Sequence, residues 1–431
     1  MNAINQVLLM VILVLPVALP IAQAETLEDA WRMAVERDPG LAATRSLTDA
    51  GKADELAARA ERWPTLTVDG TYQRFNDAPA FSFPVNGTNF TSPELVKNDD
   101  FLMARARVAM PLFTAGRVTA GIRSAEQAAR GAGLAEQSYE QDLRLQVATA
   151  YVDVLRARRA LRAAESTVAS LTSHVNDVAV MVERETVARN DLLAARVTLA
   201  DAEQVRLRAE NHNAGALAAY NRLLGEPLDR IPELAELADA PLPEATVESL
   251  VERGRASRPE LAGLDARSQA LAEKARSENA GRWPQVGLLA DYQHLENQVL
   301  DEQDFALLGV GFSWTLFDAG RIQQRSNALR SASRAAAQDR DDLQSRVALE
   351  VRQAWLDVRE ATARVPLTRE AVEQAEENLR VGRELYSVGL ATNTVVLDAE
   401  ALRLNAVRNH DNAVLDVALG NLRLKRAVGE L

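Results

Sequence analysis

Cysteine is absent from the 431-residue sequence, and clusters of basic residues are absent too. The first absence excludes disulfide bonds, thiol catalysis and a lipid anchor on an N-terminal cysteine, so the mature protein is expected to be unlipidated. The net charge of −12 is spread along the chain without a basic block. Because phosphate binding needs clustered Lys and Arg, a nucleic-acid partner is disfavoured.

Catalytic and metal-binding patterns are also missing. The sequence has no Ser-His-Asp order, no HExxH motif and no phosphate-binding glycine loop. His174, His212, His294 and His410 are isolated in the sequence, and the six Met residues do not cluster. Isolated histidines on helices or loops are usually solvated or hydrogen-bonded rather than metal ligands. We therefore predict no enzyme activity, no cofactor and no metal site.

Long apolar runs are missing from the mature chain, so any membrane crossing would have to use β-strands. Residues 1–24 resemble a secretory signal peptide, with an apolar run from Val7 to Leu15, helix breakers at Pro16 and Pro20, and the small-x-small end Ala22-Gln23-Ala24. The alternative, an anchoring helix, is disfavoured because the uninterrupted run is short of the ~20 residues that a span needs.

The chain is internally duplicated. Trp63-Pro64 recurs as Trp283-Pro284, 220 positions later, and Leu112–Arg117 (LFTAGR) recurs as Leu316–Arg321 (LFDAGR), 204 positions later. The offset between the copies decreases from 220 to 204 positions between these two landmarks, so the first copy has a longer loop there. The turn-forming residues of this loop are Pro79, Pro84, Asn86-Gly87 and Pro93.

The duplication predicts the domain organisation. After the signal peptide, residues 25–226 form a first repeat and residues 245–431 a second repeat, each with a helix, two strands and a long helical hairpin. Residues 227–244, rich in Pro and acidic residues, form the linker between them.

Each repeat contains two segments of alternating polarity with roughly the 9 to 11 residues needed to cross a bilayer. The clearest of these segments is the second one of the second repeat, where Gly309 and Gly311 belong to one face. The other face is apolar, and we predict that it contacts lipid through Leu308, Val310, Phe312 and Trp314. A soluble β-sandwich is the alternative. Four strands cannot close a membrane barrel alone, because open edges leave backbone groups unpaired in hydrocarbon. The membrane interpretation therefore requires an oligomer.

Long helices follow the strands. No Gly or Pro occurs from Leu134 to Ala214, and apolar residues recur every seven positions, as expected for a coiled-coil seam. We place the first hairpin turn near Glu183–Asn190 and the second near Gly389, and we expect Pro366 to break or kink the second ascending helix. The first limb would be on the order of 100 Å long at ~1.5 Å per residue. A soluble coiled-coil scaffold is the alternative.

These features resemble the TolC-like outer-membrane efflux and secretion channels, or outer membrane factors. The resemblance covers essentially the whole mature chain and depends on the duplication, the Leu-Phe-x-Ala-Gly-Arg junctions and the segment Tyr386–Glu400 (YSVGLATNTVVLDAE). It implies an α+β membrane protein: a homotrimeric, twelve-stranded β-barrel with four strands per chain, continued by an antiparallel coiled-coil periplasmic tunnel. It also implies location in the Gram-negative outer membrane, with a large periplasmic part.

The resemblance implies partners and site residues as well. A periplasmic adaptor (membrane fusion) protein would grip the hairpin tips, at Val388-Gly389-Leu390 and Asp191. An inner-membrane pump of the resistance-nodulation-division or ABC type would supply the energy. Tyr386 and Asp398 match positions that close the periplasmic entrance. Ala391 and Val395 stand where the family's gating Arg and another Asp would be, so the family's salt-bridge network is not preserved.

The leading function is therefore the exit duct of a tripartite efflux pump or type I secretion system, and Asp398 is expected to form a cation-attracting ring at the trimer axis. A periplasmic scaffold or adaptor is the second hypothesis, and an enzyme is a distant third. Drugs, metal ions, polysaccharide and polypeptide all fit a wide duct, so the sequence does not select a cargo.

Overall fold

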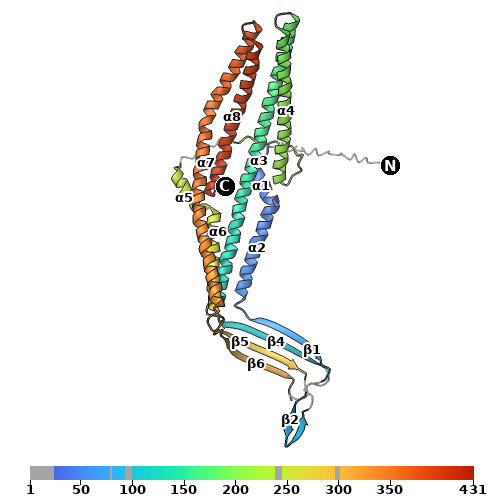
Figure 1. The fold of residues 1–431 in the computed structure, drawn as a ribbon, viewed down its shortest axis with the longest axis vertical. Helices are drawn as coiled ribbons and strands as arrows, with labels where there is room; N and C mark the ends of the chain where they lie inside the picture. Colours follow the sequence, from blue (N-terminus) through green and yellow to red (C-terminus); the bar gives the residue numbers. More distant parts are fainter. Residues whose placement is uncertain (1–23, 78–79, 93–99, 238–244, 297–300) are drawn as a thin grey trace, which may run out of the picture. The chain divides into compact units, whose positions relative to one another are not determined.

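The computed structural model describes residues 24–77, 80–92, 100–237, 245–296 and 301–431 (Figure 1). The predicted signal peptide up to residue 23, the loop residues Pro79 and Pro93, and residues 238–244 of the predicted linker lie outside the described residues.

No helix in the described residues combines the length and the apolar composition needed to cross a membrane.

The order of the elements repeats along the chain. The first half contains α1 (Leu27–Arg37), α2 (Pro39–Ala60), β1 (Thr65–Arg74), β2 (Ser82–Val85), β3 (Thr88–Thr91), β4 (Asp100–Phe113), α3 (Arg117–Glu183) and α4 (Arg189–Leu223). The second half contains α5 (Val247–Ser257), α6 (Pro259–Ala280), β5 (Gln285–Leu295), β6 (Asp304–Ser313), α7 (Arg321–Ser387) and α8 (Asn393–Val428). Helices α3 and α7 both have 67 residues, and the β2–β3 hairpin occupies the loop that only the first half contains.

The chain folds into two compact units, and each takes elements from both halves. One unit consists of residues 38–145, 242–359 and 420–431 and contains the sheet. The other consists of residues 1–37, 146–241 and 360–419 and contains the hairpin ends of the long helices. The division into two sequence repeats stays a prediction about how the chain is organised along its length.

In the unit that contains the sheet, four strands pair antiparallel in the order β1-β4-β5-β6 (Figure 1). The register brings the apolar residues of all four strands onto one face: Leu66 pairs with Val108, Val108 with Ala290, and Ala290 with Leu308. Because side chains alternate along a strand, the residues between these ones form the opposite face. The sheet therefore has one continuous apolar face, as the alternation predicts.

The end of the last strand differs from our expectation. The alternating pattern predicts Trp314 as a strand residue, but β6 ends at Ser313. The indole N–H of Trp314 donates a hydrogen bond to the backbone carbonyl of Arg282 (3.0 Å), and this contact anchors the chain as it leaves the sheet. Apolar alternation continues past the point where the ladder ends, so periodicity alone overextended the strand.

The two Leu-Phe-x-Ala-Gly-Arg junctions have the same backbone geometry. Ala115 and Gly116 have φ angles of +47° and +85°, and Ala319 and Gly320 have φ angles of +54° and +82°. Two successive left-handed residues turn the chain sharply between strand and helix, and glycine adopts this conformation without steric cost. At the second junction the Asp318 carboxylate accepts hydrogen bonds from the backbone N–H groups of Gly320 and Ile322, both 2.9 Å, and caps α7.

In the other unit, α3 and α4 form one antiparallel hairpin and α7 and α8 form another (Figure 1). Six residues of the predicted seam of α3 are each at most 2% exposed: Val147, Val154, Ala157, Ala164, Leu171 and Val178. The other five seam positions are half-buried: Ala150, Leu161, Val168, Val175 and Val182. The predicted turns are confirmed, since α3 ends at Glu183 and α7 at Ser387.

Pro366 does not break α7, contrary to one of our two expectations, because α7 is continuous from Arg321 to Ser387. A proline inside a helix removes one backbone hydrogen bond. The Thr368 hydroxyl lies 2.9 Å from the carbonyl oxygen of Arg364 and 3.0 Å from that of Val365, so this turn gains a side-chain hydrogen bond. A helix of this length tolerates the loss of one backbone hydrogen bond where the neighbouring turns keep theirs.

Candidate functional site

Both hairpin tips end their ascending helix with the same backbone motif. At the second tip, Leu390 N–H donates to the carbonyl of Leu385 (2.8 Å) and Gly389 N–H donates to that of Tyr386 (3.0 Å). These two bonds define a Schellman motif, which needs a left-handed residue at its turn. Gly389 supplies it with φ of +76°.

The first tip makes the same turn without glycine. Thr186 N–H donates to the carbonyl of Met181 (2.9 Å) and Glu185 N–H donates to that of Val182 (3.0 Å). Glu185 therefore takes the left-handed position, with φ of +58°. Since a side chain makes this conformation unfavourable, the first tip contains backbone strain that the second tip lacks.

The side chains at the two tips differ in chemistry. Val388 and Leu390 are 67% and 76% exposed on either side of Gly389. The corresponding positions of the first tip are polar or charged, and Arg184 and Thr186 are both exposed. An apolar, solvent-exposed tip costs free energy in water unless a partner covers it.

Below the second tip, Tyr386 is nearly buried, at 6% exposure, among the apolar residues Val178, Leu379, Val396 and Ala399. Its hydroxyl donates a long hydrogen bond of 3.5 Å to the carboxylate of Asp191, at the start of α4. Burial, together with the nearby Asp191 charge, raises the pKa of Tyr386 to about 12. The phenol thus stays protonated, and able to donate, at neutral pH.

Two residues that sequence reasoning missed complete this cluster. Asn393 donates from Nδ2 to the backbone carbonyl of Asp191 (3.1 Å), and its Oδ1 lies 2.7 Å from Nε2 of His174. The rings of His174 and Tyr386 are 5.5 Å apart between centroids. We call His174, Asp191, Tyr386 and Asn393 the Tyr386 cluster; it joins the first hairpin to the second.

The position of His174 in the sequence suggested an isolated side chain, but in the structure it is hydrogen-bonded and buried, at 5% exposure. One signal could have identified it. His174 follows Leu171 by three positions and precedes Val178 by four, so it lies on the same face of α3 as these two apolar residues. A polar residue at such a position indicates a buried polar contact between helices.

The remaining positions at the predicted entrance lack charge partners. Asp398 is exposed and forms no hydrogen bond or ion pair with the part of the chain that the structure describes. Ala391 packs against the apolar residues around Tyr386, and Val395 is 43% exposed. Where the family resemblance implied a salt-bridge network, this subunit has apolar packing.

On the sheet, the residues predicted to contact lipid project from one face of β6. Leu308, Val310 and Phe312 are 74%, 67% and 76% exposed. Trp314, 50% exposed, follows the strand. Such a row of exposed large side chains is unfavourable in water and favourable in hydrocarbon.

The opposite face of the sheet is polar. Arg105 and Arg107 on β4 both hydrogen-bond to the carboxylate of Asp291 on β5, at 2.8 Å and 3.0 Å. Asp291 is 7% exposed. A buried carboxylate between two guanidinium groups is incompatible with a lipid-facing surface and fits a water-filled interior.

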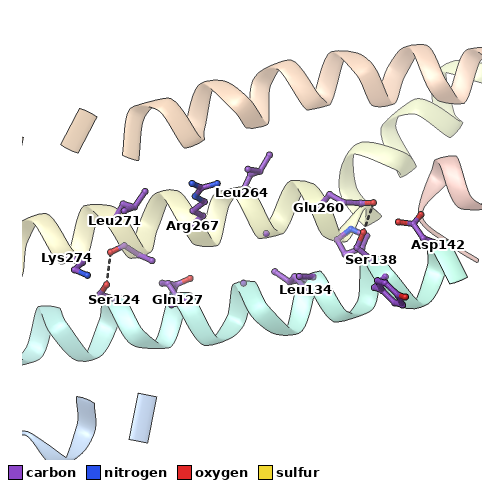
Figure 2. Close-up of a pocket in the computed structure, with 17 residues that line it drawn as sticks. Ser124, Gln127, Leu134, Ser138, Asp142, Glu260, Leu264, Arg267, Leu271 and Lys274 are labelled. Atoms are coloured by element: carbon purple, nitrogen blue, oxygen red, sulfur yellow. Dashed lines mark hydrogen bonds between the residues drawn. The ribbon is translucent and has the colours of Figure 1, made fainter. Parts of the chain in front are cut away.

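A groove of about 740 Å³ lies between α3 and α6 in the unit that contains the sheet (Figure 2). Several of its polar groups already bind each other: Ser124 Oγ donates to the carbonyl of Ala270 (2.8 Å) and Ser138 Oγ donates to Glu260 (2.9 Å). These contacts hold the two helices together and present no reactive constellation. Among the described residues, no cluster of three or more His, Asp or Glu side chains could hold a metal ion.

Comparisons with known proteins agree with one another. The family model described as "Outer membrane efflux protein" matches residues 31–226 and 250–430. The outer membrane protein TolC of Vibrio cholerae is 23% identical over 420 residues, which cover 95% of this chain and 91% of TolC. The alkaline protease secretion protein AprF of Pseudomonas aeruginosa is 23% identical over 416 residues, 94% of this chain and 84% of AprF.

Among solved structures, the outer membrane protein VceC of Vibrio cholerae superposes with a TM-score of 0.79 at 18% identity. The alignment covers 94% of this chain and 96% of VceC. The order of helices and strands described above is thus that of a known outer-membrane protein fold.

Proposed function

The chain belongs to the outer membrane efflux protein family, and from that premise we propose how its sheet and hairpins act. Proteins of this family are channels rather than enzymes. The chain is an outer-membrane channel of a Gram-negative bacterium and serves as an exit duct in efflux or type I secretion. In our proposal it assembles as a homotrimer, docks a periplasmic adaptor at its hairpin tips and closes its entrance through Tyr386 packing and contacts between its coiled-coil hairpins.

The trimer is supported by the four-stranded sheet, which has one continuous apolar face and two edge strands, β1 and β6, that are unpaired on their outer sides. Unpaired backbone groups are too costly in hydrocarbon for such a sheet to insert alone. Pairing β1 of one copy with β6 of the next closes three sheets into twelve strands. The polar face, with Asp291 between its two arginines, then lines the interior.

The trimer is tested by purifying the chain from outer membranes in detergent and running it unheated and heated on a denaturing gel. We expect a heat-sensitive trimer that conducts ions in planar bilayers. A monomer that stays soluble without detergent and does not conduct would contradict the proposal and favour a periplasmic scaffold.

The exposed apolar side chains of the second tip support adaptor docking there. Val388 and Leu390 lie on a turn that Gly389 shapes, so their presentation is fixed by the backbone rather than by a flexible loop. An inner-membrane pump of the resistance-nodulation-division or ABC type would act through that adaptor. AprF is an alkaline protease secretion protein, so a polypeptide is one candidate cargo beside drugs, metal ions and polysaccharide.

Docking is tested with Leu390→Ser, using Leu402→Ser on α8 as the matched control, since Leu402 is also exposed, at 57%. Both variants should fold, form trimers and conduct ions like wild type. In the native host, only Leu390→Ser should lower export, measured as resistance to toxic compounds and as the amount of secreted protein. Equal export by the two variants would refute docking through this residue.

We propose further that Asp398 lines the pore at the entrance. Its carboxylate is exposed and forms no ion pair within the described subunit, whereas Glu377 and Glu384 on α7 both pair with Arg380 of the same helix. Three such carboxylates around the trimer axis would attract cations and repel anions.

A further inference from the structure

The most buried charged side chain among the described residues of the hairpins is Glu400 on α8, at 1% exposure. Ionised groups in the interior are costly unless they are paired and hydrogen-bonded. The partners of this carboxylate therefore decide what it does.

Glu400 is paired on both oxygens by residues from three helices. Oε1 accepts hydrogen bonds from Arg383 of α7 (2.6 Å) and from the hydroxyl of Ser170 of α3, and Arg383 also donates to Ser170. Oε2 accepts from Arg403 of α8 (3.3 Å), whose Nη2 donates to Thr167 of α3 (3.2 Å). We call these five residues the Glu400 cluster.

The Glu400 cluster joins the two hairpins of one subunit, because Thr167 and Ser170 belong to the first hairpin and the other three residues to the second. It lies next to the Tyr386 cluster. Arg383 precedes Tyr386 by three residues on α7, and Ser170 precedes His174 by four on α3, so the two clusters are about one helical turn, ~5 Å, apart. Two polar layers thus connect the hairpins directly below the tips.

The two layers differ in strength. The Tyr386 cluster contains a hydrogen bond of 3.5 Å and no ion pair. The Glu400 cluster contains two ion pairs, and its carboxylate is almost completely shielded from water. Charge-assisted hydrogen bonds at buried sites are stronger than neutral ones. Both ion pairs lie within the second hairpin, so Glu400 reaches the first hairpin through the charge-assisted hydrogen bond from Ser170. Ion pairs between the two hairpins occur farther from the tips, where Arg156 and Arg159 of α3 pair with Asp416 and Asp411 of α8.

An entrance built from hairpins widens only if neighbouring hairpins move apart. Ala391 and Val395 provide no charge with which to hold them together at the tip. We propose that Glu400 is the positioning residue that holds the second hairpin against the first and thereby keeps the entrance closed. This inference rests on the proposed function as a trimeric duct.

The proposal requires opening to break the Glu400 contacts to Ser170 and Arg383. Glu400→Gln keeps the shape of the side chain but removes its charge, which leaves the largely buried Arg403, at 15% side-chain exposure, without its carboxylate. Arg383→Met removes one arm of the cluster and leaves Glu400 paired with Arg403. Since Arg383 is 41% exposed, this second variant should fold even if the first one does not.

The matched control is Glu377→Gln. Glu377 lies on α7 and pairs with Arg380 of the same helix, where both side chains are more than half exposed. This substitution makes the same chemical change in the same hairpin without touching the first hairpin.

Two measurements follow on trimers purified in detergent. In planar bilayers, where a closed entrance limits the current, we expect Glu400→Gln to raise the mean current at least tenfold and Arg383→Met to raise it severalfold. A spin label on Val388→Cys, the only thiol in this cysteine-free chain, should report a longer distance between subunits in both variants. Glu377→Gln should match wild type in current and distance. A loss of stability alone would change the melting temperature but not the label distance in folded trimers.

Wild-type current and label distance in folded Arg383→Met and Glu400→Gln trimers would overturn the role of Glu400 while leaving the duct intact. If Glu400→Gln does not fold, wild-type values in Arg383→Met alone overturn it. If wild-type protein neither forms trimers nor conducts, the proposed function fails first, and the two failures are thereby distinguished.

Discussion

Placing an arginine on the apolar face of β6 should block assembly in the membrane, whereas the same change one residue later should not. Val310 is 67% exposed and belongs to the face that carries Leu308 and Phe312. Arginine near the bilayer midplane of a barrel costs about 2 to 4 kcal/mol per side chain. Three copies in a trimer therefore cost about 6 to 12 kcal/mol, comparable to the whole stability of a typical domain.

The control is Gly311→Arg. Gly311 belongs to the opposite face of the same strand, and a Cβ atom added there meets no other atom within 4 Å. The variant has the same added charge at nearly the same depth, and the new side chain would enter the interior of the channel. It should assemble like wild type and conduct less current.

The assay is the amount of heat-sensitive trimer in isolated outer membranes, with total expression as the reference. Val310→Arg should reduce this amount at least tenfold relative to Gly311→Arg. Equal assembly of the two variants would show that Val310 does not face lipid. Failure of Gly311→Arg alone would show that the two faces are assigned the wrong way round.

Three further predictions concern the hairpins. Glu185→Gly should stabilise the first tip by about 1 to 2 kcal/mol per subunit and raise the melting temperature, because only glycine adopts positive φ without steric cost. Gly389→Ala should destabilise the second tip and lower the melting temperature for the same reason. Unchanged melting temperatures in both variants would contradict the strain argument. The pKa of Tyr386 is raised to about 12, so folding favours its protonated form, and the stability that this phenol contributes is complete below pH 10 and disappears as the pH rises toward 12. The current through planar bilayers should therefore rise over that range. Tyr386→Phe cannot ionise and should lack this alkaline increase in current. Asp398→Ala should reduce cation selectivity, measured from reversal potentials in a salt gradient, and weaken block by multivalent cations added on the periplasmic side; wild-type values would place Asp398 away from the pore.

The sequence alone determined the features that depend on neighbours along the chain. Alternating polarity identified the apolar face of β6, the seven-residue repeat identified six buried residues of α3, and Gly389 marked the position of the second turn. These patterns are local because side-chain direction repeats every 2 residues in a strand and about every 3.6 in a helix. The same argument extended β6 past its true end, because alternation does not report where backbone pairing stops.

Only the tertiary structure showed which residues of different hairpins meet. Glu400 and Ser170 are separated by 230 positions, and Asn393 and His174 by 219. Their contact depends on how α3, α7 and α8 are rotated and shifted against one another, and helix periodicity does not fix these quantities. For the same reason the sequence alone presented Glu400 as one of many helical carboxylates, and its burial between two arginines followed only from the packing of three helices.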